Sequence, residues 1–137
     1  MIETYRGIVF PHQEDHMGHM NVMWYISKFD EATWHFFAQF GVTPTYIKET
    51  NCGLAAVEQN VKYLVEVQAG TLLVVRTEIM AMKPKAVTYR HTMFNAETET
   101  PIATCKMVAV HLDLGKRKAL PFPSEIQAKC QTLLADG

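Results

Sequence analysis

The first long segment of the chain has apolar residues at the spacing of a helix. Between residues 22 and 40 they recur at intervals of three and four, if a threonine is allowed as a neutral member: Ile26, Phe29, Thr33, Phe36, Phe37 and Phe40. Asn21 is a good N-cap residue, Gly41 stands where helices commonly stop, and Pro44 follows it. The pattern predicts a helix over 22–40.

From Val57 onward the period changes to two, which is typical of strands. Turn-forming residues divide this part of the chain at Gly70, at Lys83-Pro84-Lys85, at 97–101 and at 115–118. The pattern predicts strands over 57–67, 71–82, 86–96 and 102–114, after an initial strand over 4–10. A short helix that starts at 123–125 is expected to end the chain.

One strand, a long helix and four strands predict an α+β fold in which an antiparallel sheet wraps around a single long central helix. The phenylalanine-rich face of the helix needs such a sheet to bury it. A length of 137 residues indicates a single domain over 1–137. An open sheet leaves an edge strand exposed, so we expect pairing of sheets in a homodimer or homotetramer.

Composition excludes some classes of partner. The formal net charge is −1, so the chain has no overall field that would attract nucleic acid or a membrane surface, and any anionic ligand must be held by local cations. No apolar run reaches the roughly 20 residues of a membrane span, and the first residues lack a signal-peptide pattern, so we expect a cytoplasmic protein. The widely spaced Cys52, Cys105 and Cys130 are expected to be reduced, with Cys105 in the core.

The stretch "EDHMGHMNVMWY", residues 14–25, raises the question of a metal site. Four potential ligands lie close together just before the helix: His12, Asp15, His16 and His19. Pro11, Gly18 and Asn21 favour a loop, however, where a spacing of four does not bring side chains to one face. No second ligand cluster follows, so we favour structural histidines and expect no metal.

Asp15 lies six residues before Asn21, too far to cap the helix without folding back. The loop therefore brings an additional carboxylate near the positive end of a helix dipole, where backbone N–H groups have no intrahelical partner. Such N–H groups can polarise a carbonyl, and the carboxylate can promote attack on it.

The motif D-x-x-G-H-x-N-x-x-x-Y, followed by "FDEA" at 29–32, resembles the hotdog-fold acyl-CoA thioesterases related to 4-hydroxybenzoyl-CoA thioesterase. Its residues here are Asp15, Gly18, His19, Asn21 and Tyr25. The resemblance covers nearly the whole chain, because the order of strands and helix also matches. The usual motif has a second asparagine after Asn21 where this chain has Val22, a departure that bears on the subfamily more than on the fold.

The resemblance implies that Asp15 is the catalytic carboxylate, as nucleophile or as the base that activates water. Val22 would offer its backbone N–H to the thioester carbonyl, and a thioester passes through an oxyanion that such donors stabilise. His19 and Asn21 would shape the loop, a role we rank above acid/base chemistry for His19. Tyr25 is one of several aromatic residues that could line an acyl pocket, although such residues more often belong to the core.

Other carboxylates are candidates as well. Asp30 falls on the buried stripe of the predicted helix, and the resemblance puts that position near the acyl group; a bond to a neighbouring strand is the alternative. Glu58 and Glu66 lie at the two ends of the second strand. Because some hotdog thioesterases use a strand carboxylate, these two provide a reserve mechanism.

Coenzyme A carries phosphates, which require local cations. Lys83, Lys85 and Arg90 match the place where relatives bind the nucleotide end, although charged hairpin tips are commonly just solvated. No glycine-rich phosphate loop is present, and we expect no cofactor. The sequence leaves the acyl group open among aromatic, short- or medium-chain and betainyl groups.

The sequence as a whole predicts an acyl-CoA thioesterase that releases a free acid and coenzyme A. A hydroxyacyl-thioester dehydratase on the same fold would typically carry "HFPGxP", which this chain lacks. A non-catalytic module that binds acyl thioesters is the third possibility, and the loop carboxylate argues against it.

Overall fold

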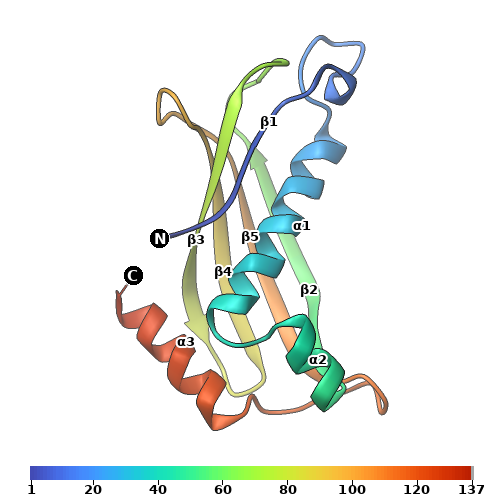
Figure 1. The fold of residues 1–137 in the computed structure, drawn as a ribbon, viewed down its shortest axis with the longest axis vertical. Helices are drawn as coiled ribbons and strands as arrows, with labels where there is room; N and C mark the ends of the chain where they lie inside the picture. The colour runs from blue at the N-terminus through green and yellow to red at the C-terminus, as the bar shows by residue number, and fades with distance from the viewer. Residues whose placement is uncertain (137) are drawn as a thin grey trace.

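A computed structural model describes residues 1–136, which form one curved sheet and three α-helices (Figure 1). The chain begins with strand β1 (Ile2–Ile8), continues through a 3₁₀ turn (Pro11–Gln13) and enters the long helix α1 (Val22–Gln39). The remaining elements are α2 (Pro44–Thr50), β2 (Cys52–Tyr63), β3 (Leu72–Met82), β4 (Ala86–Asn95), β5 (Pro101–Asp113), the two-residue β6 (Lys118–Ala119) and α3 (Ser124–Asp136). The predicted α+β class is confirmed.

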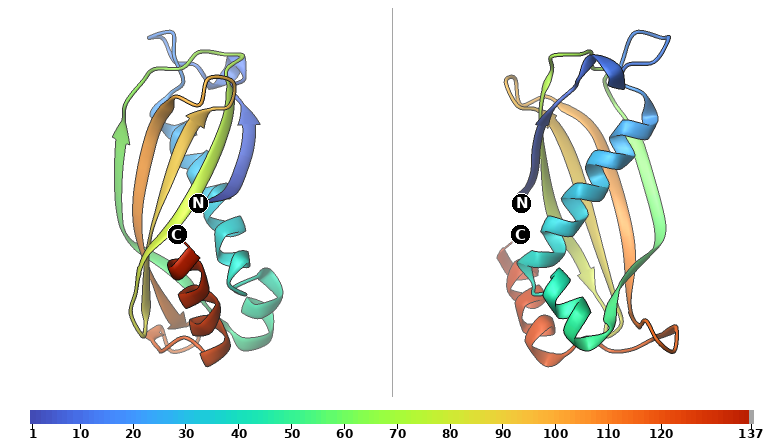
Figure 2. Two further views of the ribbon diagram at one scale, coloured as in Figure 1. Left: turned by 90° about the vertical axis from the view of Figure 1, so that its left-hand side faces the viewer. Right: turned by 45° about the vertical axis from the view of Figure 1, so that its right-hand side comes forward.

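The sheet has the strand order β1-β3-β4-β5-β2, every pair is antiparallel, and β6 adds to β5. Helix α1 runs along one face of the sheet, while α2 and α3 lie at the end away from the loop that precedes α1 (Figure 2). Strands β1 and β2 are the two edges. The arrangement leaves the start of α1 next to the ends of β1 and β2.

Helix α1 begins and ends where its sequence signals indicate. The Asn21 side chain accepts a hydrogen bond from the Met23 N–H, which is the N-cap geometry. Gly41 has a φ of 99°, the left-handed conformation that glycine adopts without strain and that commonly follows a helix end. The helix buries its aromatic face against the sheet, with Phe29 and Phe36 at most 2% exposed. This packing fixes the position of the first turn.

The strands alternate as their sequences predict. On β4, Tyr89, His91 and Met93 are fully buried toward α1, while Arg90 points to the other face of the sheet. The edge strand β2 bonds only to β5, and it carries exposed apolar side chains such as Val57 (62% exposed). A free edge of this kind is a site for pairing with another strand.

Several details differ from the sequence-based expectation, and the first is that β1 spans Ile2–Ile8 instead of 4–10. Helix α2 was not predicted, although Thr43 caps it and Pro44 occupies its first turn. Strand β2 begins at Cys52 instead of 57, because pairing with β5 outweighs the low strand propensity of its glycine and alanines. It also ends earlier, at Tyr63, because the N–H groups of Leu64 and Val65 both donate to Ile102 O and the chain leaves the ladder there.

Candidate active site

The loop before α1 is held by its own backbone. Glu14 and Met20 form a β-bridge, and the Asp15 N–H donates to His19 O at 3.0 Å. Gly18 allows the tight turn between them, with a φ of 82° that a residue with a side chain rarely adopts. The Met20 N–H donates to Val67 O, which ties the loop to the segment after β2. The loop therefore has a defined shape before any ligand arrives.

The Asp15 carboxylate is fixed by two donors. Its Oδ1 accepts from the Met17 N–H at 2.9 Å, and its Oδ2 accepts from Asn21 Nδ2 at 3.2 Å. The Met17 bond, followed by the one from Asn21, lowers the pKa of Asp15 below its ordinary value, because both stabilise the charged form. Asp15 is therefore an ionised, partly exposed carboxylate at neutral pH.

Asn21 connects this carboxylate to the helix. Its Oδ1 accepts from the Met23 N–H, and its backbone oxygen accepts from the Trp24 N–H. The N–H of Val22, in the same first turn, makes no hydrogen bond within residues 1–136. A free donor at the positive end of an 18-residue helix is suited to a developing oxyanion.

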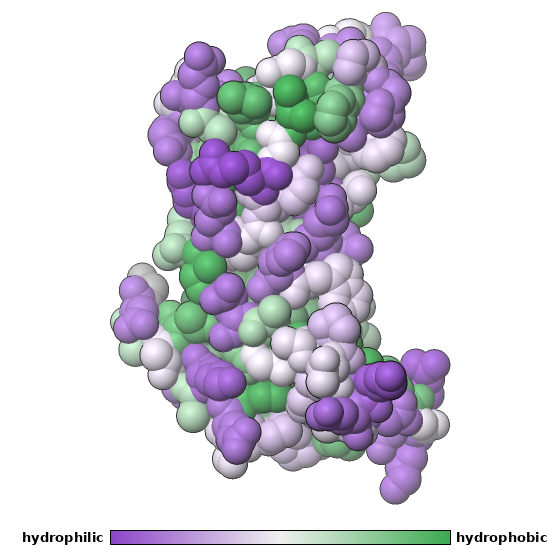
Figure 3. All heavy atoms as spheres, viewed as in Figure 1, coloured by the Kyte–Doolittle hydropathy of each residue, from purple (hydrophilic) through white to green (hydrophobic). Residues whose placement is uncertain are grey.

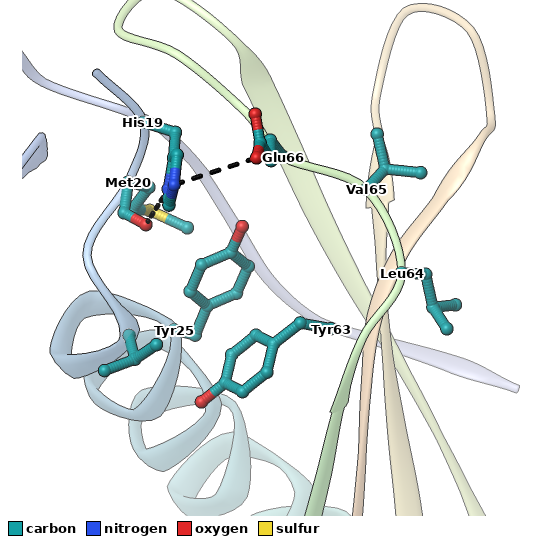
Figure 4. Close-up of a pocket in the computed structure, with 8 residues that line it drawn as sticks. His19, Met20, Tyr25, Tyr63, Leu64, Val65 and Glu66 are labelled. Atoms are coloured by element: carbon teal, nitrogen blue, oxygen red, sulfur yellow. Dashed lines mark hydrogen bonds and ion pairs between the residues drawn. The ribbon is translucent and has the colours of Figure 1, made fainter. Parts of the chain in front are cut away.

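A cavity of about 320 Å³ opens beside this turn. It lies between the loop, the start of α1 and the segment after β2, and Figure 4 shows how its side chains are arranged. Its lining residues are His19, Met20, Val22, Tyr25, Tyr63, Leu64, Val65 and Glu66. The rings of Tyr25 and Tyr63 meet edge to face, with their centroids 5.0 Å apart. Burial raises the pKa of Tyr25, so its hydroxyl stays protonated.

His19 points into this cavity from the loop (Figure 4). Its Nδ1 lies 3.3 Å from Met20 O and therefore carries the proton in that contact, which leaves Nε2 3.8 Å from the exposed Glu66 carboxylate. Asp15 does not line the cavity itself; it lies on the loop side of Asn21. The geometry thus brings His19 and Val22 to the cavity and Asp15 to its margin.

A second cavity, of about 310 Å³, follows α1 toward the middle of the molecule. Its lining residues are Met23, Ile26, Ser27, Phe29, Asp30, Thr33, Gln59 and Met107. The expectation that Asp30 is buried was wrong: it is exposed on the rim, because this side of α1 faces the open edge at β2 instead of the sheet. Asp30 forms no bond to a neighbouring strand within residues 1–136.

The remaining predicted residues do not gather at one place. Glu58 is exposed at the β-bulge of β2, and Glu66 is exposed beside His19. Lys83 and Lys85 are exposed on the hairpin between β3 and β4, at the end of the sheet opposite the start of α1 (Figure 1). Arg90 pairs with Glu78 on the outer face of the sheet. Within one chain, the proposed phosphate ligands are therefore separated from the loop.

The exposed apolar residues are concentrated around the same loop. On the face shown in Figure 3 the largest apolar patch lies near the upper end, and smaller apolar patches lie at the left edge and in the lower half. Phe10, Val22 and Met23 are each more than half exposed. An apolar surface beside a polar loop suits either a ligand or another chain.

Several lining residues were missed by sequence reasoning. Tyr63 and Gln59 were assigned to a strand without a role, because only the fold shows that β2 borders the cavities. Thr33 was treated as a neutral member of the apolar stripe, and His91 was not singled out. The signal for His91 was its place between Tyr89 and Met93, which made it the one histidine on the inward face of that strand.

Three kinds of feature are absent from the described residues: a metal-binding group, a disulfide bond and a membrane-spanning helix. No group of three or more His, Cys, Asp or Glu side chains within 1–136 is arranged to hold a metal ion. The three cysteines are free, and Cys105 and Cys130 are buried, where burial raises the pKa of each thiol to about 11. None of the described helices is long and apolar enough to cross a membrane.

Comparison with known proteins gives one family. The model of the thioesterase-like superfamily matches residues 9–130. Betainyl-CoA thioesterase of Pseudomonas aeruginosa is 24% identical over 133 residues, which cover 97% of this chain and 84% of the relative.

Solved structures agree on the architecture. A Staphylococcus aureus protein solved in complex with CoA superposes with a TM-score of 0.90 at 19% identity, covering 98% of this chain and 87% of that one. The 1,4-dihydroxy-2-naphthoyl-CoA thioesterase of Synechocystis gives a TM-score of 0.81 at 18% identity, covering 94% and 95%. The expected hotdog fold is confirmed.

Proposed function

The chain belongs to the thioesterase-like superfamily, and from this premise we propose that it hydrolyses an acyl-CoA thioester to a free carboxylic acid and coenzyme A. The observation that carries the proposal is the pairing of two groups at the start of α1. Asp15 is an ionised carboxylate held by Met17 and Asn21, and Val22 offers an unbonded N–H at the wall of the adjacent cavity. A general base or nucleophile next to an oxyanion donor is what acyl transfer requires.

The proposed reaction begins with the thioester carbonyl near the Val22 N–H. Either Asp15 attacks the carbonyl carbon and forms an anhydride that water then hydrolyses, or it takes a proton from a water that attacks directly. In both routes the carbonyl oxygen becomes an oxyanion, which the N–H and the helix dipole stabilise. The C–S bond then breaks and coenzyme A leaves as a thiolate, which needs little acid assistance. His19 and Asn21 hold the loop in place.

Tyr25 and Asp30 are the proposed contacts of the acyl group. Tyr25 lies in the first cavity and Asp30 on the rim of the second. The two cavities lie one after the other along α1, and the acyl chain would extend from the first toward the second. The Pseudomonas aeruginosa relative is named for a quaternary ammonium acyl group. Glu58 and Glu66 remain the reserve carboxylates, and Glu66 is the nearer of the two to the cavity.

We also propose that the complete site needs a second copy of the chain. Strands β2 of two protomers can pair antiparallel about a two-fold axis, which would satisfy the free edge of each sheet. Because the two β2 strands would run in opposite directions, the β3–β4 hairpin of the partner would lie at the same end of the dimer as the loop that carries Asp15. Lys83 and Lys85 would then bind coenzyme A phosphates beside the loop of the other chain.

The proposal is tested by a thiol-release assay with coenzyme A esters of short, branched, aromatic, long-chain and betainyl acids. We expect saturable hydrolysis of at least one class. If coenzyme A esters bind and none is hydrolysed, the protein is a binding module and the proposal fails. Release of water from a hydroxyacyl ester, without release of thiol, would instead identify a dehydratase.

A further inference from the structure

A third cavity, of about 440 Å³, lies on the face of the sheet that α1 does not cover. Its lining comes from the neighbouring strands β4, β5 and β2 and from the residue that follows β2. The lining residues are Asn60, Lys62, Leu64, Arg90, Thr104 and Lys106. Three of these six described residues are cations and none is a carboxylate. This cationic cavity therefore concentrates positive charge in a chain whose formal net charge is −1.

The strand register brings the cations together. Lys106 on β5 lies opposite Arg90 on β4 and opposite Asn60 on β2. Lys62 lies opposite Thr104, and Thr104 shares a face with Lys106 because the two are two residues apart on one strand. Like charges at directly opposite positions of a sheet are destabilising. The sheet therefore has an unfavourable charge arrangement that a bound anion would relieve.

Few carboxylates neutralise these charges. Glu78 accepts a hydrogen bond from Arg90 Nη2 and so compensates one of the three cations. Lys62 and Lys106 form no ion pair within residues 1–136. Glu58, the other carboxylate on this face of β2, forms none either. The two lysines are thus available to a ligand.

Arg90 has donors that Glu78 does not use. Its Nε is buried and has no hydrogen-bond partner within the described residues, and its Nη1 makes no hydrogen bond there. A buried donor without a partner is unfavourable. A guanidinium binds a phosphate or carboxylate best through two N–H groups at once. A turn of the guanidinium toward the cavity would give both nitrogens an acceptor on a bound anion.

We infer that the cationic cavity is a binding site for a small molecule that carries a diphosphate group. Two uncompensated positive charges call for a polyanion, and the volume is that of a ligand pocket, larger than a single ion needs. Asn60 and Thr104 add neutral hydrogen-bond donors. No aromatic ring is among the described lining residues, so the phosphate groups themselves are recognised. The inference goes beyond the proposed hydrolysis and does not depend on it.

A protein partner fits this cavity less well than a small anion. Leu64 is its one apolar lining residue, whereas protein interfaces have an apolar core. Two copies of the chain packed face to face about a two-fold axis would bring the lysines of one copy toward those of the other, which is repulsive. A small anion gains from the same charges.

Two kinds of molecule could supply the diphosphate group. One is a free nucleoside diphosphate. The other is coenzyme A, because Leu64 lines both the cationic cavity and the cavity beside Val22 where the thioester is proposed to bind. The site chemistry is the same for both, so the source is decided by competition.

The test is a ¹H–¹⁵N NMR titration of the whole chain with inorganic diphosphate, at an ionic strength held constant with NaCl. We expect saturable shifts in the backbone N–H signals of Lys62, Thr104 and Lys106 and in the side-chain Nε–H signal of Arg90. Inorganic phosphate should bind more weakly, because it reaches fewer cations. Shifts no larger than those caused by NaCl alone would overturn the inference.

Variants that each remove one charge test the role of the lysines. Lys62→Gln and Lys106→Gln should each raise the Kd of diphosphate about three- to fivefold, the effect of one partly exposed charge pair. Lys48→Gln removes the same charge from α2, outside the cavity, and should keep the wild-type Kd. Equal Kd values for Lys106→Gln and Lys48→Gln would overturn the inference.

Unfolding in urea without ligand excludes a purely structural role for Lys106. Lys106→Gln should leave the free energy of unfolding unchanged or raise it, because it removes a charge opposite Arg90. A lower free energy of unfolding would show that Lys106 is paired with Glu58 in solution, and would count against the site.

Competition with ADP and with coenzyme A identifies the source. Displacement of diphosphate by both with similar affinity supports a site for free nucleotides. Displacement by coenzyme A about tenfold better than by ADP would assign the site to the substrate and replace Lys83 and Lys85 as its phosphate ligands. Displacement by neither would overturn the inference. Binding is measured without turnover, so a failure to hydrolyse any thioester would contradict the proposed function alone.

Discussion

The Asn21 side chain donates to the Asp15 carboxylate at 3.2 Å while its oxygen caps the first turn of α1 at the Met23 N–H. One residue therefore positions both the proposed base and the proposed oxyanion site. Substitutions can separate these two roles. Serine can cap a helix but cannot supply the amide donor to Asp15.

We predict that Asn21→Ser lowers kcat by about tenfold and leaves the free energy of unfolding within about 0.5 kcal/mol of wild type. Asn21→Ala should lower kcat similarly and also cost about 1 kcal/mol of stability, because the cap is lost. Steady-state kinetics and urea unfolding provide the two measurements. A serine variant with wild-type kcat would remove the Asp15 contact from the mechanism.

The pKa of Asp15 leads to a prediction about pH. Its folded-state pKa lies below the ordinary value of 3.8, so the base is ionised throughout the neutral range and is lost only as the pH falls through that lowered pKa. We expect kcat/KM to have no acidic limb from Asp15 above about pH 5. In Asn21→Ala the limb should move to higher pH. An unchanged acidic limb in that variant would contradict the assignment.

Burial of His91 predicts a loss of stability in acid. Its pKa falls from 6.5 to about 3 on folding, so the neutral ring stabilises the fold fully above 6.5 and this contribution is lost as the pH falls toward 3. Between these values the free energy of unfolding should decrease by up to about 1.4 kcal/mol per pH unit from this group. This prediction is checked by measuring the free energy of unfolding in urea for wild type and His91→Gln between pH 4 and about pH 8. If the free energy of unfolding depends on pH in the same way for both proteins, His91 does not make this contribution.

Two tyrosines form a matched pair for stability. The Tyr89 hydroxyl is buried near the Thr33 side chain but makes no bond of full hydrogen-bond geometry in the described part of the chain, whereas Tyr46 Oη lies 2.8 Å from His111 Nε2. Tyr89→Phe should therefore leave the free energy of unfolding unchanged or raise it, while Tyr46→Phe should cost about 1–2 kcal/mol. Thermal and urea unfolding of the two variants give the two changes in the free energy of unfolding. A larger loss for Tyr89→Phe would reveal a bond to its hydroxyl.

The shared site can be tested by mixing two inactive chains. If Asp15 works with the partner's hairpin, a heterodimer of Asp15→Asn and the Lys83→Ala/Lys85→Ala double variant contains one intact site and one that lacks both groups. At low acyl-CoA concentration it should recover about half of the wild-type activity. If both groups belong to one chain, no site is intact and activity stays low. Light scattering would confirm the dimer in each sample.

The sequence predicted most of the local structure because the signals were strong and local. Asn21 and Gly41 marked the two ends of α1, and alternation marked β3, β4 and β5. The errors came from long-range effects. Asp30 was expected to be buried because helical spacing alone cannot show that one flank of α1 faces an open sheet edge.

The candidate site, too, combines residues that are close in sequence with residues that only the fold brings together. Asp15, His19 and Val22 were predicted from a motif within a few residues, and the structure brings the last two to one cavity. The partnership of Thr33 with His91 joins residues 58 positions apart, and no local pattern could indicate it. Lys83 and Lys85 were grouped with Arg90 because they are neighbours in sequence, but Arg90 lies mid-strand on the outer face and pairs with Glu78.

The central claim is that Asp15 promotes hydrolysis of an acyl-CoA thioester. The most direct measurement is the rate of thiol release by Asp15→Asn on the best coenzyme A ester, beside Asp113→Asn as a control. Asp113, the last residue of β5, is a second aspartate whose side chain accepts hydrogen bonds, here from two backbone N–H groups, and these bonds likewise lower its pKa. We predict that Asp15→Asn loses at least about 100-fold in kcat with little change in unfolding, and that Asp113→Asn keeps wild-type kcat. Near-normal turnover by Asp15→Asn would contradict the account and move attention to Glu66.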